Sequence, residues 1–401
     1  MTLTFAEACR LLFARTGGAT TWSLGPTTEL LAALGDPHTH VPAVHIGGTN
    51  GKGSVAVLVA EALRVAGHRV GLYTSPHLVD VRERMLVDGR PIPAAAFAAW
   101  TERLLADAVR TDASFFEVTT AIALADFAAR GADLSVIEVG LGGRLDATNV
   151  LTPLVSAVTR VALEHTDYLG PTLEHIAREK AGIAKPGVPF VVGESDPVLV
   201  QHLRRVAEAC GAPVHVVPRE ARYEGPLAMR GGHQRRNAAV AQAVLEALPA
   251  EQRPPAAAVR QGFARARLPG RLDRRGRWLF DVAHNPDGIS TLLRAIATEP
   301  PPRPLHAVIG ILGDKDWRQM LDALLGAVDA LWVTNAPTAP PARAWDLEAV
   351  ASAFGAAVHV EPELHDALAA ASSGARTVLV CGSFHTVGDA MARLPGLAPL
   401  G

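Results

Sequence analysis

The stretch that decides the fold of this chain reads VHIGGTNGKGS and covers residues 44–54. A short apolar segment leads into a glycine-rich turn, which is followed by a lysine, a hydroxyl residue and an apolar helix. The glycines allow backbone N–H groups to converge on phosphate oxygens, and Lys52 can reach the outer phosphates. The alternative is a glycine turn that only joins a strand to a helix. The order of the residues favours nucleotide binding, so we predict that the chain uses ATP.

The residue after this lysine departs from the common phosphate-loop pattern. That pattern has serine or threonine directly after the lysine, whereas this chain has Gly53 there and Ser54 one residue later. We therefore expect Ser54 to be the hydroxyl ligand of a Mg²⁺ ion bound with the nucleotide. The residues of the loop that we expect to contact ATP are Gly48, Thr49, Asn50, Gly51, Lys52, Gly53 and Ser54.

Length and composition limit the class of protein. The chain has 401 residues, of which 49% are hydrophobic and 19% charged, and this predicts two or three domains with sizeable cores. The formal net charge of −2 argues against a nucleic-acid-binding protein that depends on bulk positive charge. The three cysteines are isolated in the sequence, which suggests a reducing compartment and no cysteine metal site.

The sequence shows no sign of a membrane-spanning or export segment. No apolar run approaches the roughly 20 residues that cross a bilayer. The first residues lack a basic region followed by an apolar core. We therefore expect a cytoplasmic protein without membrane or nucleic-acid partners, and a monomer is the default expectation.

Residues 41–218 alternate between apolar, β-rich runs and helical stretches. Strands that are apolar throughout are typical of a parallel sheet covered on both faces, so this block is predicted to be α/β. The predicted strands are 43–46, 69–73, 134–139, 155–161, 190–192 and 214–217. The predicted helices are about 54–66, 94–110, 117–130, 171–183 and 197–210, followed by two more at about 234–247 and 256–265.

A second α/β block begins near residue 278 and has no phosphate loop of its own. Its predicted strands are 278–282, 306–312, 330–334, 357–360 and 377–380, and its predicted helices are about 286–297, 317–327, 346–354, 363–371 and 386–393. The turn-forming, charged segment 268–276 is expected to be a hinge between the two blocks.

We therefore predict an N-terminal P-loop ATPase-type domain with a mainly parallel sheet, residues 1–268, and a smaller C-terminal Rossmann-like α/β domain, residues 277–401. Residues 269–276 are the predicted hinge linker. Ligands of such sheets bind at the carboxyl ends of the strands, so a cleft between the domains is expected to close on ATP.

A dense polar segment, EVGLGGRLDATN at residues 138–149, overlaps the end of a predicted strand. A carboxylate such as Glu138 at a strand end, opposite a phosphate loop, suits a Mg²⁺ ion that is bound through oxygen atoms. The alternative is a glycine turn held by an Arg144–Asp146 ion pair. The concentration of glycine, arginine, aspartate, threonine and asparagine in so few positions favours a site.

Polar residues follow two further strands of the same block. Ser75 and His77 lie in a loop after the second predicted strand and are candidates for a metal or phosphate contact, although Ser-Pro-His is more often only a turn. Glu164 and His165 follow the predicted strand 155–161. A lone histidine is weak evidence, but its position after a third strand of one sheet favours a functional role.

Other polar positions carry less information on their own. Lys180, near a helix end, is most simply a solvated lysine. Gln234 and Asn237 near a helix start have amides that can contact a base edge, but they also fit an ordinary polar helix start. Asp281 and His284 follow a strand of the second block, beside a helix N-cap that explains their neighbours but not these two side chains.

Taken together, these motifs resemble the folylpolyglutamate synthase/dihydrofolate synthase family, within the Mur-ligase superfamily. The resemblance runs from about Leu24 to Ser383, nearly the whole chain, and the motifs occur in the family's order. The glycine at position 53 is itself the family's usual form. The matching segments are 48–54, 74–78, 116–119, 138–149, 164–165, 179–183, 233–237, 269–272, 281–286, 314–316 and 381–383.

The resemblance implies roles for the residues around the phosphates. Lys52 and the loop amides would hold the triphosphate, with Ser54, Ser75 and Glu138 around one Mg²⁺ ion. Glu138 and His165 would hold a second Mg²⁺ ion. In the second block, Arg271 would touch the phosphates, and Asp281 and His284 would bring that domain onto the γ-phosphate.

Three further roles follow from the same resemblance. Lys180 matches the lysine that this family carries as a carbamate, which would turn a cation into an anionic partner of the metal or phosphate site. Gln234 and Asn237 would lie beside the adenine. Phe116 and Asp146 match positions near the pterin, where an aromatic face and a carboxylate suit a flat, hydrogen-bonding ring.

The reaction implied by the resemblance is ATP-driven amide formation. A carboxylate of dihydropteroate or of a reduced folate attacks the γ-phosphate to give an acyl phosphate and ADP. The amino group of L-glutamate then attacks the activated carbonyl, and phosphate leaves. The residues expected to take part in catalysis are Lys52, Lys180, Arg271 and His284.

Other functions stay open on the sequence alone. A cell-wall ligase that extends a UDP-linked precursor usually has a nucleotide-sugar domain before the phosphate loop, and here 46 residues precede Gly47. A kinase would phosphorylate its acceptor without an amine. A non-catalytic ATP-binding regulator, or a ligase with another acceptor, is a further alternative, but a regulator has no need of Glu138, His165, Lys180 and His284 together. No residue separates dihydropteroate from reduced folate as the acceptor.

Overall fold

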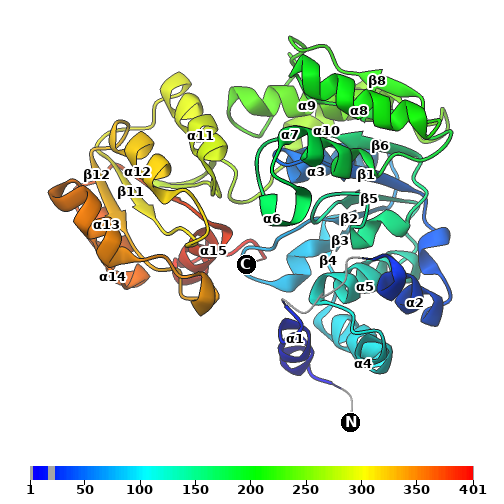
Figure 1. Ribbon diagram of the computed structural model, residues 1–401, viewed down its shortest axis with the longest axis horizontal. Helices are drawn as coiled ribbons and strands as arrows, with labels where there is room; N and C mark the ends of the chain where they lie inside the picture. Colours follow the sequence, from blue (N-terminus) through cyan, green and yellow to red (C-terminus); the bar gives the residue numbers. More distant parts are fainter. Residues whose placement is uncertain (1–2, 17–22, 401) are drawn as a thin grey trace. The chain divides into compact units, whose positions relative to one another are not determined.

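The computed structural model describes residues 3–16 and 23–400, which form two compact units (Figure 1). Short segments at 77–80 and 229–234 belong to the second unit, together with the chain from Arg267 onward, and the rest forms the first unit. Each unit is an α/β fold on a mainly parallel sheet, which confirms the predicted fold class. The predicted domain boundaries and the cleft between the domains stay predictions.

The first unit is built on a sheet whose strands are β1 Ala43–Gly47, β2 Val70–Tyr73, β3 Met85–Val87, β4 Arg90–Pro91, β5 Leu134–Glu138, β6 Val155–Val158, β7 Phe190–Val192 and β8 Val214–Val216. Their order is β4-β3-β2-β5-β1-β6-β7-β8, so the strand before the glycine-rich loop is central. Every pairing from β2 to β8 is parallel, whereas β3 and β4 extend one edge in antiparallel fashion.

Helices cover both faces of this sheet. They are α1 Phe5–Phe13, α2 Gly25–Ala33, α3 Lys52–Val65, α4 Ala94–Arg110, α5 Phe115–Ala129, α6 Thr166–Leu169, α7 Leu173–Ala181, α8 Pro197–Ala209, α9 Gly232–Glu246 and α10 Ala256–Arg265. Helix α3 packs on β1, β2 and β5, and α10 packs on α3. Helix α5 packs in one buried cluster with α1, α2 and α4, and α7 and α8 form another with β6 and β7. Strand β1 is therefore buried on both faces, as its apolar sequence predicts.

Two helices at the start of the chain were not predicted from the sequence. Helix α1 begins with a capping box, in which the Thr4 hydroxyl accepts from the Glu7 N–H and the Glu7 carboxylate accepts from the Thr4 N–H. Helix α2 has Pro26 in its first turn and no side-chain cap. The Thr-x-x-Glu sequence is a recognised helix start, so α1 was predictable, whereas α2 is set by packing of its buried leucines, Leu30 and Leu31.

The strand predicted at 155–161 ends early, at Val158. The next residue, Thr159, turns its hydroxyl to the carbonyl oxygens of Gly47 and Asn50, at 3.2 and 2.9 Å. Arg160 then forms an isolated antiparallel bridge with Asn50. The chain leaves the sheet after Val158 because Thr159 and Arg160 contact the glycine-rich loop instead of continuing the strand.

The second unit has the strands β9 Asp273–Arg275, β10 Trp278–Phe280, β11 Leu305–Ile309, β12 Ala330–Val333, β13 His359–Val360 and β14 Thr377–Cys381. Their order is β13-β12-β11-β14-β10-β9, parallel except for the edge strand β9. Its helices are α11 Pro286–Thr298, α12 Trp317–Leu325, α13 Leu347–Phe354, α14 Leu364–Ser372 and α15 Phe384–Arg393. One buried cluster contains side chains of α11, α12 and α13, and a second contains those of α14 and α15.

Strand β9 lies in the segment that the sequence predicted to be a turn-forming hinge. Its residues, Asp273, Arg274 and Arg275, are polar, so no apolar alternation announces a strand. A turn at Gly276, with a positive φ of 62°, brings these residues back against β10. An edge strand with solvent on one side tolerates charged side chains.

Within the residues that the structure describes, no helix is both long enough and apolar enough to cross a membrane.

Candidate active site

The glycine-rich loop between β1 and α3 requires glycine at two positions. Gly48 and Gly51 have positive φ values of 137° and 95°. A Cβ atom at Gly48 would lie 2.0 Å from Thr159 Oγ1, and one at Gly51 would lie 2.7 Å from Asn237 Oδ1. Gly51 is the N-cap of α3 and provides no side-chain cap. The first N–H groups of α3 are therefore available to an anion, as in phosphate-binding loops.

The loop is fixed from its other side by the segment after β6. The Thr49 N–H donates to the Arg160 carbonyl at 2.6 Å, and the Ala162 N–H donates to Thr49 Oγ1 at 3.1 Å. Lys52 Nζ donates to the Thr49 carbonyl at 3.1 Å, so the lysine side chain folds across the loop. These contacts hold the shape of the loop and the position of the lysine side chain.

Lys180 is buried, with 4% of its surface exposed, although its position near the end of α7 pointed to a solvated lysine. Its Nζ atom donates to the carbonyl of Gly48 at 2.9 Å, which places it against the phosphate loop. Burial, reinforced by the charge of Lys52, lowers the pKa of Lys180 to about 7. The amine is therefore partly neutral near physiological pH, as carbamate formation from an amine requires.

Glu138 is a buried carboxylate at the end of β5, level with Ile46 on the neighbouring strand β1. One of its oxygens accepts from the Ser75 N–H at 3.0 Å, which brings the loop after β2 to the same place. Ser54 is buried in the first turn of α3. Carboxylate and hydroxyl oxygens are the ligands that Mg²⁺ prefers, so the chemistry of these donors fits the predicted ion.

His165 is more exposed than Ser54 and Glu138, two of the other predicted metal ligands. It is exposed, adopts a left-handed backbone conformation with φ 53° and precedes the short helix α6. Among the described residues, no group of three or more histidine, cysteine, aspartate or glutamate side chains is placed to hold a metal by itself.

Arg84 is a buried arginine that no sequence motif indicates, and it lies close enough to Glu138 to feel its charge. Arg84 donates to the phenol oxygen of Tyr73, its guanidinium lies 5.1 Å from the ring centroid of Phe115, and the negative charge of Glu138 acts on it. Burial lowers its pKa. Nothing in the sequence distinguishes it from a surface arginine beside a strand, because its burial depends on packing against α5.

Asp146 is fully buried and accepts hydrogen bonds from four donors. They are the backbone N–H of Leu141 at 2.8 Å, that of Thr148 at 3.0 Å, the Thr148 hydroxyl and the backbone of Gly140. Burial raises the pKa of Asp146, and these donors oppose that change. The carboxylate thereby shapes the segment Gly140–Leu145, which we call the acceptor loop.

Phe116 and a small pocket lie at the acceptor loop. A Cβ atom on Gly140 would lie 2.3 Å from the Phe116 ring, so the ring packs directly on the backbone, and its centroid is 6.0 Å from that of Tyr73. A pocket of about 90 Å³ opens among loop residues 141–145, Tyr168, Leu169 and Glu179. Phe116 and Asp146 both contact the acceptor loop, and their role as pterin contacts stays a prediction.

The acceptor loop also touches the helix that carries Lys180. A Cβ atom on Gly143 would lie 2.7 Å from the Glu179 carbonyl oxygen and 2.9 Å from that of Lys180. The Arg144 N–H donates to the Glu179 carbonyl at 2.9 Å, and the Arg144 guanidinium pairs with the Glu179 carboxylate at 3.1 Å. The acceptor loop, the end of α7 and the phosphate loop form one contiguous structure.

Gln234 and Asn237, the predicted adenine contacts, lie three residues apart in α9 and so share a helix face. Gln234 is buried, and Asn237 packs beside Gly51 of the phosphate loop. The structure therefore brings Asn237 to the phosphate loop, while Gln234 belongs to the segment 229–234 that is grouped with the second unit.

In the second unit, Asp281 is a buried carboxylate after β10. Its two oxygens accept from the N–H groups of Leu272 and Ala283, each at 2.9 Å. Burial raises the pKa of Asp281, and the charge of Arg271 opposes the rise. The carboxylate therefore holds the turn that carries Arg271 and the turn that carries His284.

Arg271 and His284 both approach Phe384 at the start of α15. The Arg271 guanidinium carbon lies 5.3 Å from the Phe384 ring centroid, and the His284 ring centroid lies 5.7 Å from it. The His284 Nδ1 atom lies 2.9 Å from the Val282 carbonyl oxygen, which makes Nδ1 the protonated nitrogen. The second unit thus assembles Arg271, Asp281 and His284 in one place.

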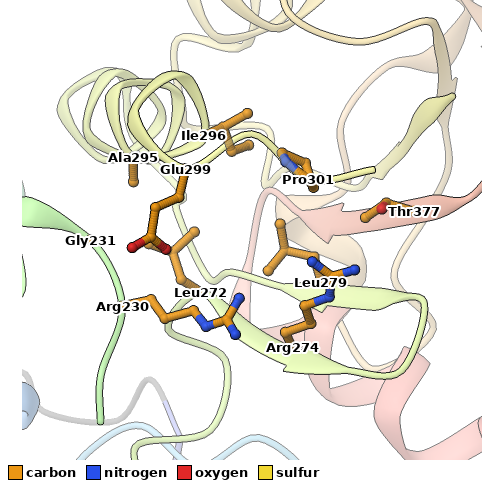
Figure 2. Close-up of a pocket in the computed structure, with 10 residues that line it drawn as sticks. All are labelled: Arg230, Gly231, Leu272, Arg274, Leu279, Ala295, Ile296, Glu299, Pro301 and Thr377. Atoms are coloured by element: carbon orange, nitrogen blue, oxygen red, sulfur yellow. The ribbon is translucent and has the colours of Figure 1, made fainter. Parts of the chain in front are cut away.

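A separate pocket of about 30 Å³ in the second unit contains none of these three residues (Figure 2). Arg230 and Glu299 both line it, together with the apolar side chains of Leu272, Leu279 and Ile296. Its volume suits a water molecule or two rather than a substrate.

Sequence models of two Mur ligase domains match this chain. The Mur ligase middle domain matches residues 46–224, and the Mur ligase glutamate ligase domain matches residues 270–384. The dihydrofolate synthase/folylpolyglutamate synthase of Escherichia coli is 38% identical over 367 residues, which is 86% of this chain and 85% of that protein. The chain belongs to the folylpolyglutamate synthase/dihydrofolate synthase family of Mur ligases.

Solved structures of the family have the same fold. The structure of E. coli FolC in complex with DHPP and ADP has a TM-score of 0.87 and 33% identity, with 97% of each chain covered. The bifunctional folylpolyglutamate synthase/dihydrofolate synthase of Yersinia pestis, complexed with AMPPNP and Mn, has a TM-score of 0.86 and 32% identity, with 98% of each chain covered. The chain spans about half the length of two haloarchaeal relatives, 49% and 48%, which are probable bifunctional folylpolyglutamate synthase/dihydropteroate synthases.

Proposed function

We propose that this protein is an ATP-dependent ligase that adds L-glutamate to dihydropteroate, to reduced folates or to both. The observation that carries the proposal is the contact between three elements of the first unit. The phosphate loop, the buried lysine Lys180 and the acceptor loop touch one another through Gly48 and Gly143. Family relatives with these names, and neighbours that bind ADP and DHPP, support the same activity.

The first proposed step is phosphoryl transfer from ATP to the acceptor carboxylate. Lys52 and the open N-terminus of α3 would neutralise charge on the phosphates. Gln234 and Asn237 are the proposed adenine contacts, and the support for Asn237 is its position beside Gly51. Asp146 and Phe116 hold the pterin so that the carboxylate points toward the phosphate loop. The gain comes from positioning the carboxylate and from charge neutralisation.

Ser54, Ser75 and Glu138 are the proposed ligands of a Mg²⁺ ion, and Glu138 and His165 those of a second. When bound, Mg²⁺ neutralises the negative charge of the transferring phosphoryl group. The support from this chain is the chemistry of its donors, a buried carboxylate and two hydroxyls at one edge of the sheet.

Lys180 is the proposed site of a carbamate. Its support is the combination of burial, a pKa of about 7 and contact with the phosphate loop. A neutral amine attacks the carbon of CO₂, loses a proton and becomes an anion. This change would turn a repulsive neighbour of Lys52 into an attractive one.

The second proposed step is attack of the glutamate amine on the acyl phosphate, with loss of phosphate. Arg271 would bind the negatively charged phosphates, and His284 would act at the γ-phosphate. Asp281 would hold the turns that carry both residues. This assignment rests on the grouping of these residues around Phe384. We also propose a monomeric, cytoplasmic enzyme whose partners are these small molecules alone.

Incubation of the pure protein with Mg·ATP, L-glutamate and either dihydropteroate or tetrahydrofolate tests the proposal, with product masses as the readout. A gain of one glutamyl unit on dihydropteroate alone indicates a dihydrofolate synthase, and a gain on tetrahydrofolate alone indicates a polyglutamate synthase. A gain on both indicates a bifunctional enzyme. Tight ATP binding without any gain would contradict the proposal and favour another acceptor or a regulator.

A further inference from the structure

His45, in the centre of β1, has no part in the chemistry described above. It is fully buried in a strand whose neighbouring side chains, Val44 and Ile46, are aliphatic. Its Nε2 atom lies 2.8 Å from Thr148 Oγ1, whereas its Nδ1 atom has no partner among the described residues. A buried polar atom without a partner costs stability, so an aliphatic residue would serve the fold better.

The hydrogen-bond donors around Thr148 fix where the histidine proton lies. The Thr148 hydroxyl donates to an oxygen of Asp146, which as a carboxylate can only accept. The hydroxyl has one proton, so its contact with His45 must be one in which Nε2–H donates. His45 is therefore the Nε2–H tautomer, and the lone pair on its Nδ1 atom accepts no hydrogen bond from the described residues.

The charge of this histidine is equally well defined. Burial, with a smaller effect from the charge of Lys185, lowers the pKa of His45 to about 3. The ring stays neutral over the working range of pH. It therefore acts as a fixed dipole that donates to Thr148, and it adds no charge near Asp146.

We propose that His45 is a positioning residue that orients the Asp146 carboxylate through the hydroxyl of Thr148. With His45 on its lone pair, the Thr148 hydroxyl keeps its proton directed at Asp146, which also holds the backbone of Leu141 in the acceptor loop. Without His45, the Thr148 hydroxyl keeps Asp146 as its acceptor but loses the N–H contact on its oxygen, so the donor to the carboxylate is held less firmly. The inference rests on the proposed function, in which Asp146 contacts the pterin.

Binding of dihydropteroate and of ADP to matched variants tests this role. His45→Leu removes the donor, and His45→Gln returns an N–H group at a similar distance. A neutral hydrogen bond predicts that His45→Leu weakens dihydropteroate binding roughly threefold to tenfold, with ADP binding unchanged, and that His45→Gln recovers most of the loss. Equal dihydropteroate binding by wild type and His45→Leu overturns the proposal, as does equal weakening of both ligands.

Ser156 provides a matched control. It is level with His45 on the neighbouring strand β6, is fully buried and has an Oγ atom without a partner in the described structure. Side chains level with each other on parallel strands share a face, so Ser156→Ala changes the same layer without touching Thr148. It should leave dihydropteroate binding unchanged. A loss equal to that of His45→Leu would show general disturbance of the layer and overturn the positioning role.

A double-mutant cycle and a spectroscopic measurement keep the test decisive. Thr148→Val removes the donor itself and should cause at least the loss of His45→Leu, and the double variant should lose no more than Thr148→Val alone. Additive losses would overturn the relay. In wild-type protein with ¹⁵N-labelled histidine, His45 should show a protonated Nε2 and an unprotonated Nδ1 between about pH 5 and 9.

The NMR result separates this inference from the proposed function. An Nδ1–H tautomer or an imidazolium at His45 overturns the relay even when the wild type makes product. Absence of dihydropteroate binding and of product in the wild type overturns the proposed function, and with it the role in acceptor binding. The tautomer measurement would then still decide the hydrogen-bond chain itself.

Discussion

Two strand-to-helix connections, one in each unit, differ in how the following helix begins. After β1, the N-cap of α3 is Gly51, which provides no side-chain hydrogen bond. After β10, the N-cap of α11 is Asn285, whose side-chain oxygen accepts from the Gly288 N–H at 2.7 Å. Both connections follow a buried strand of a mainly parallel sheet. The helix start without a side-chain cap is the one after the glycine-rich loop, whereas the helix start next to Asp281 and His284 is closed by the side chain of Asn285.

The contrast extends to the buried charges beside each connection. Lys180 lies against the open loop, and its cation is opposed by burial and by Lys52. Asp281 lies beside the closed connection, and backbone N–H groups satisfy both of its oxygens. The first site stores an unfavourable interaction that a ligand or a carbamate can relieve. The second is satisfied already, which is typical of a residue that positions others.

The largest expected effect comes from removing the cation of the open loop. Lys52→Ala should reduce kcat by about 10³-fold or more, because the lysine neutralises phosphate charge in the transition state. The fold should survive, because the lysine makes one hydrogen bond to the loop. Steady-state kinetics with a circular dichroism spectrum check this. A Lys52→Ala variant with near-normal turnover would contradict the assignment of Lys52 to the ATP site.

Lys180→Met should reduce turnover by about 10²-fold. Addition of bicarbonate or of short-chain acids tests whether the loss is due to a missing carbamate. If the carbamate matters, wild-type activity should fall in CO₂-free buffer and return with bicarbonate. Small carboxylic acids should partly rescue a Lys180→Ala variant. Indifference of both proteins to these additions would argue against a carbamate.

Lys180→Met should also change how the free energy of unfolding depends on pH. The pKa of Lys180 is about 7 in the folded protein against 10.5 in the unfolded chain, so between these values the unfolded state binds more protons. The free energy of unfolding should therefore gain up to about 1.4 kcal/mol per pH unit from this residue as the pH rises. Urea titrations in CO₂-free buffer compare wild type with Lys180→Met. Parallel pH profiles for the two would be inconsistent with the lowered pKa.

Gly48→Ala should break the open connection by steric overlap. The new Cβ atom would lie 2.0 Å from Thr159 Oγ1 in a backbone conformation that favours glycine. We expect a loss of about 2–3 kcal/mol of stability and at least tenfold weaker ADP binding. Calorimetry measures both quantities. Gly187→Ala, which also has a positive φ but nothing within 4 Å, is the control for strain alone and should keep ADP binding.

The smallest expected effect is at the closed connection. Asn285→Ala removes the cap of α11 and should cost about 1 kcal/mol of stability. ADP affinity should not change, because this helix start is not proposed to hold phosphate. Chemical denaturation and ADP titration measure the two. A tenfold loss of ADP affinity would show that the two connections are less different than their caps suggest.

The sequence predicts the parallel strands of both sheets and most helices, because these strands are apolar throughout and are separated by glycine and polar turns. It also places the phosphate loop, since glycine, lysine and serine there have a local geometric meaning. The antiparallel edge strands β3, β4 and β9 were not predicted. Strands β3 and β4 have only 3 and 2 residues, and the residues of β9 are charged and lie on a solvated edge. Helix α1 escaped although its Thr4–Glu7 capping box was visible in the sequence.

The environment of the site could not be predicted in the same way. Burial of Lys180 and Arg84 arises from segments far apart in the chain, so spacing alone made one a solvated lysine and left the other unnoticed. The four donors around Asp146 are another example, because they depend on the turn that the carboxylate itself creates. Residue type suggests the chemistry, and tertiary packing sets the charge state.

The close approach of Gly143 to the end of α7 has a mechanical consequence. Backbone meets backbone at Gly143, whereas α7 reaches the Gly48 carbonyl through the Lys180 side chain. A displacement of the acceptor loop at Gly143 is therefore passed to α7, and any coupling between the two proposed sites through this contact would act in both directions. A side chain added at position 143 would meet backbone atoms of α7, whereas one added at position 140 would meet the ring of Phe116.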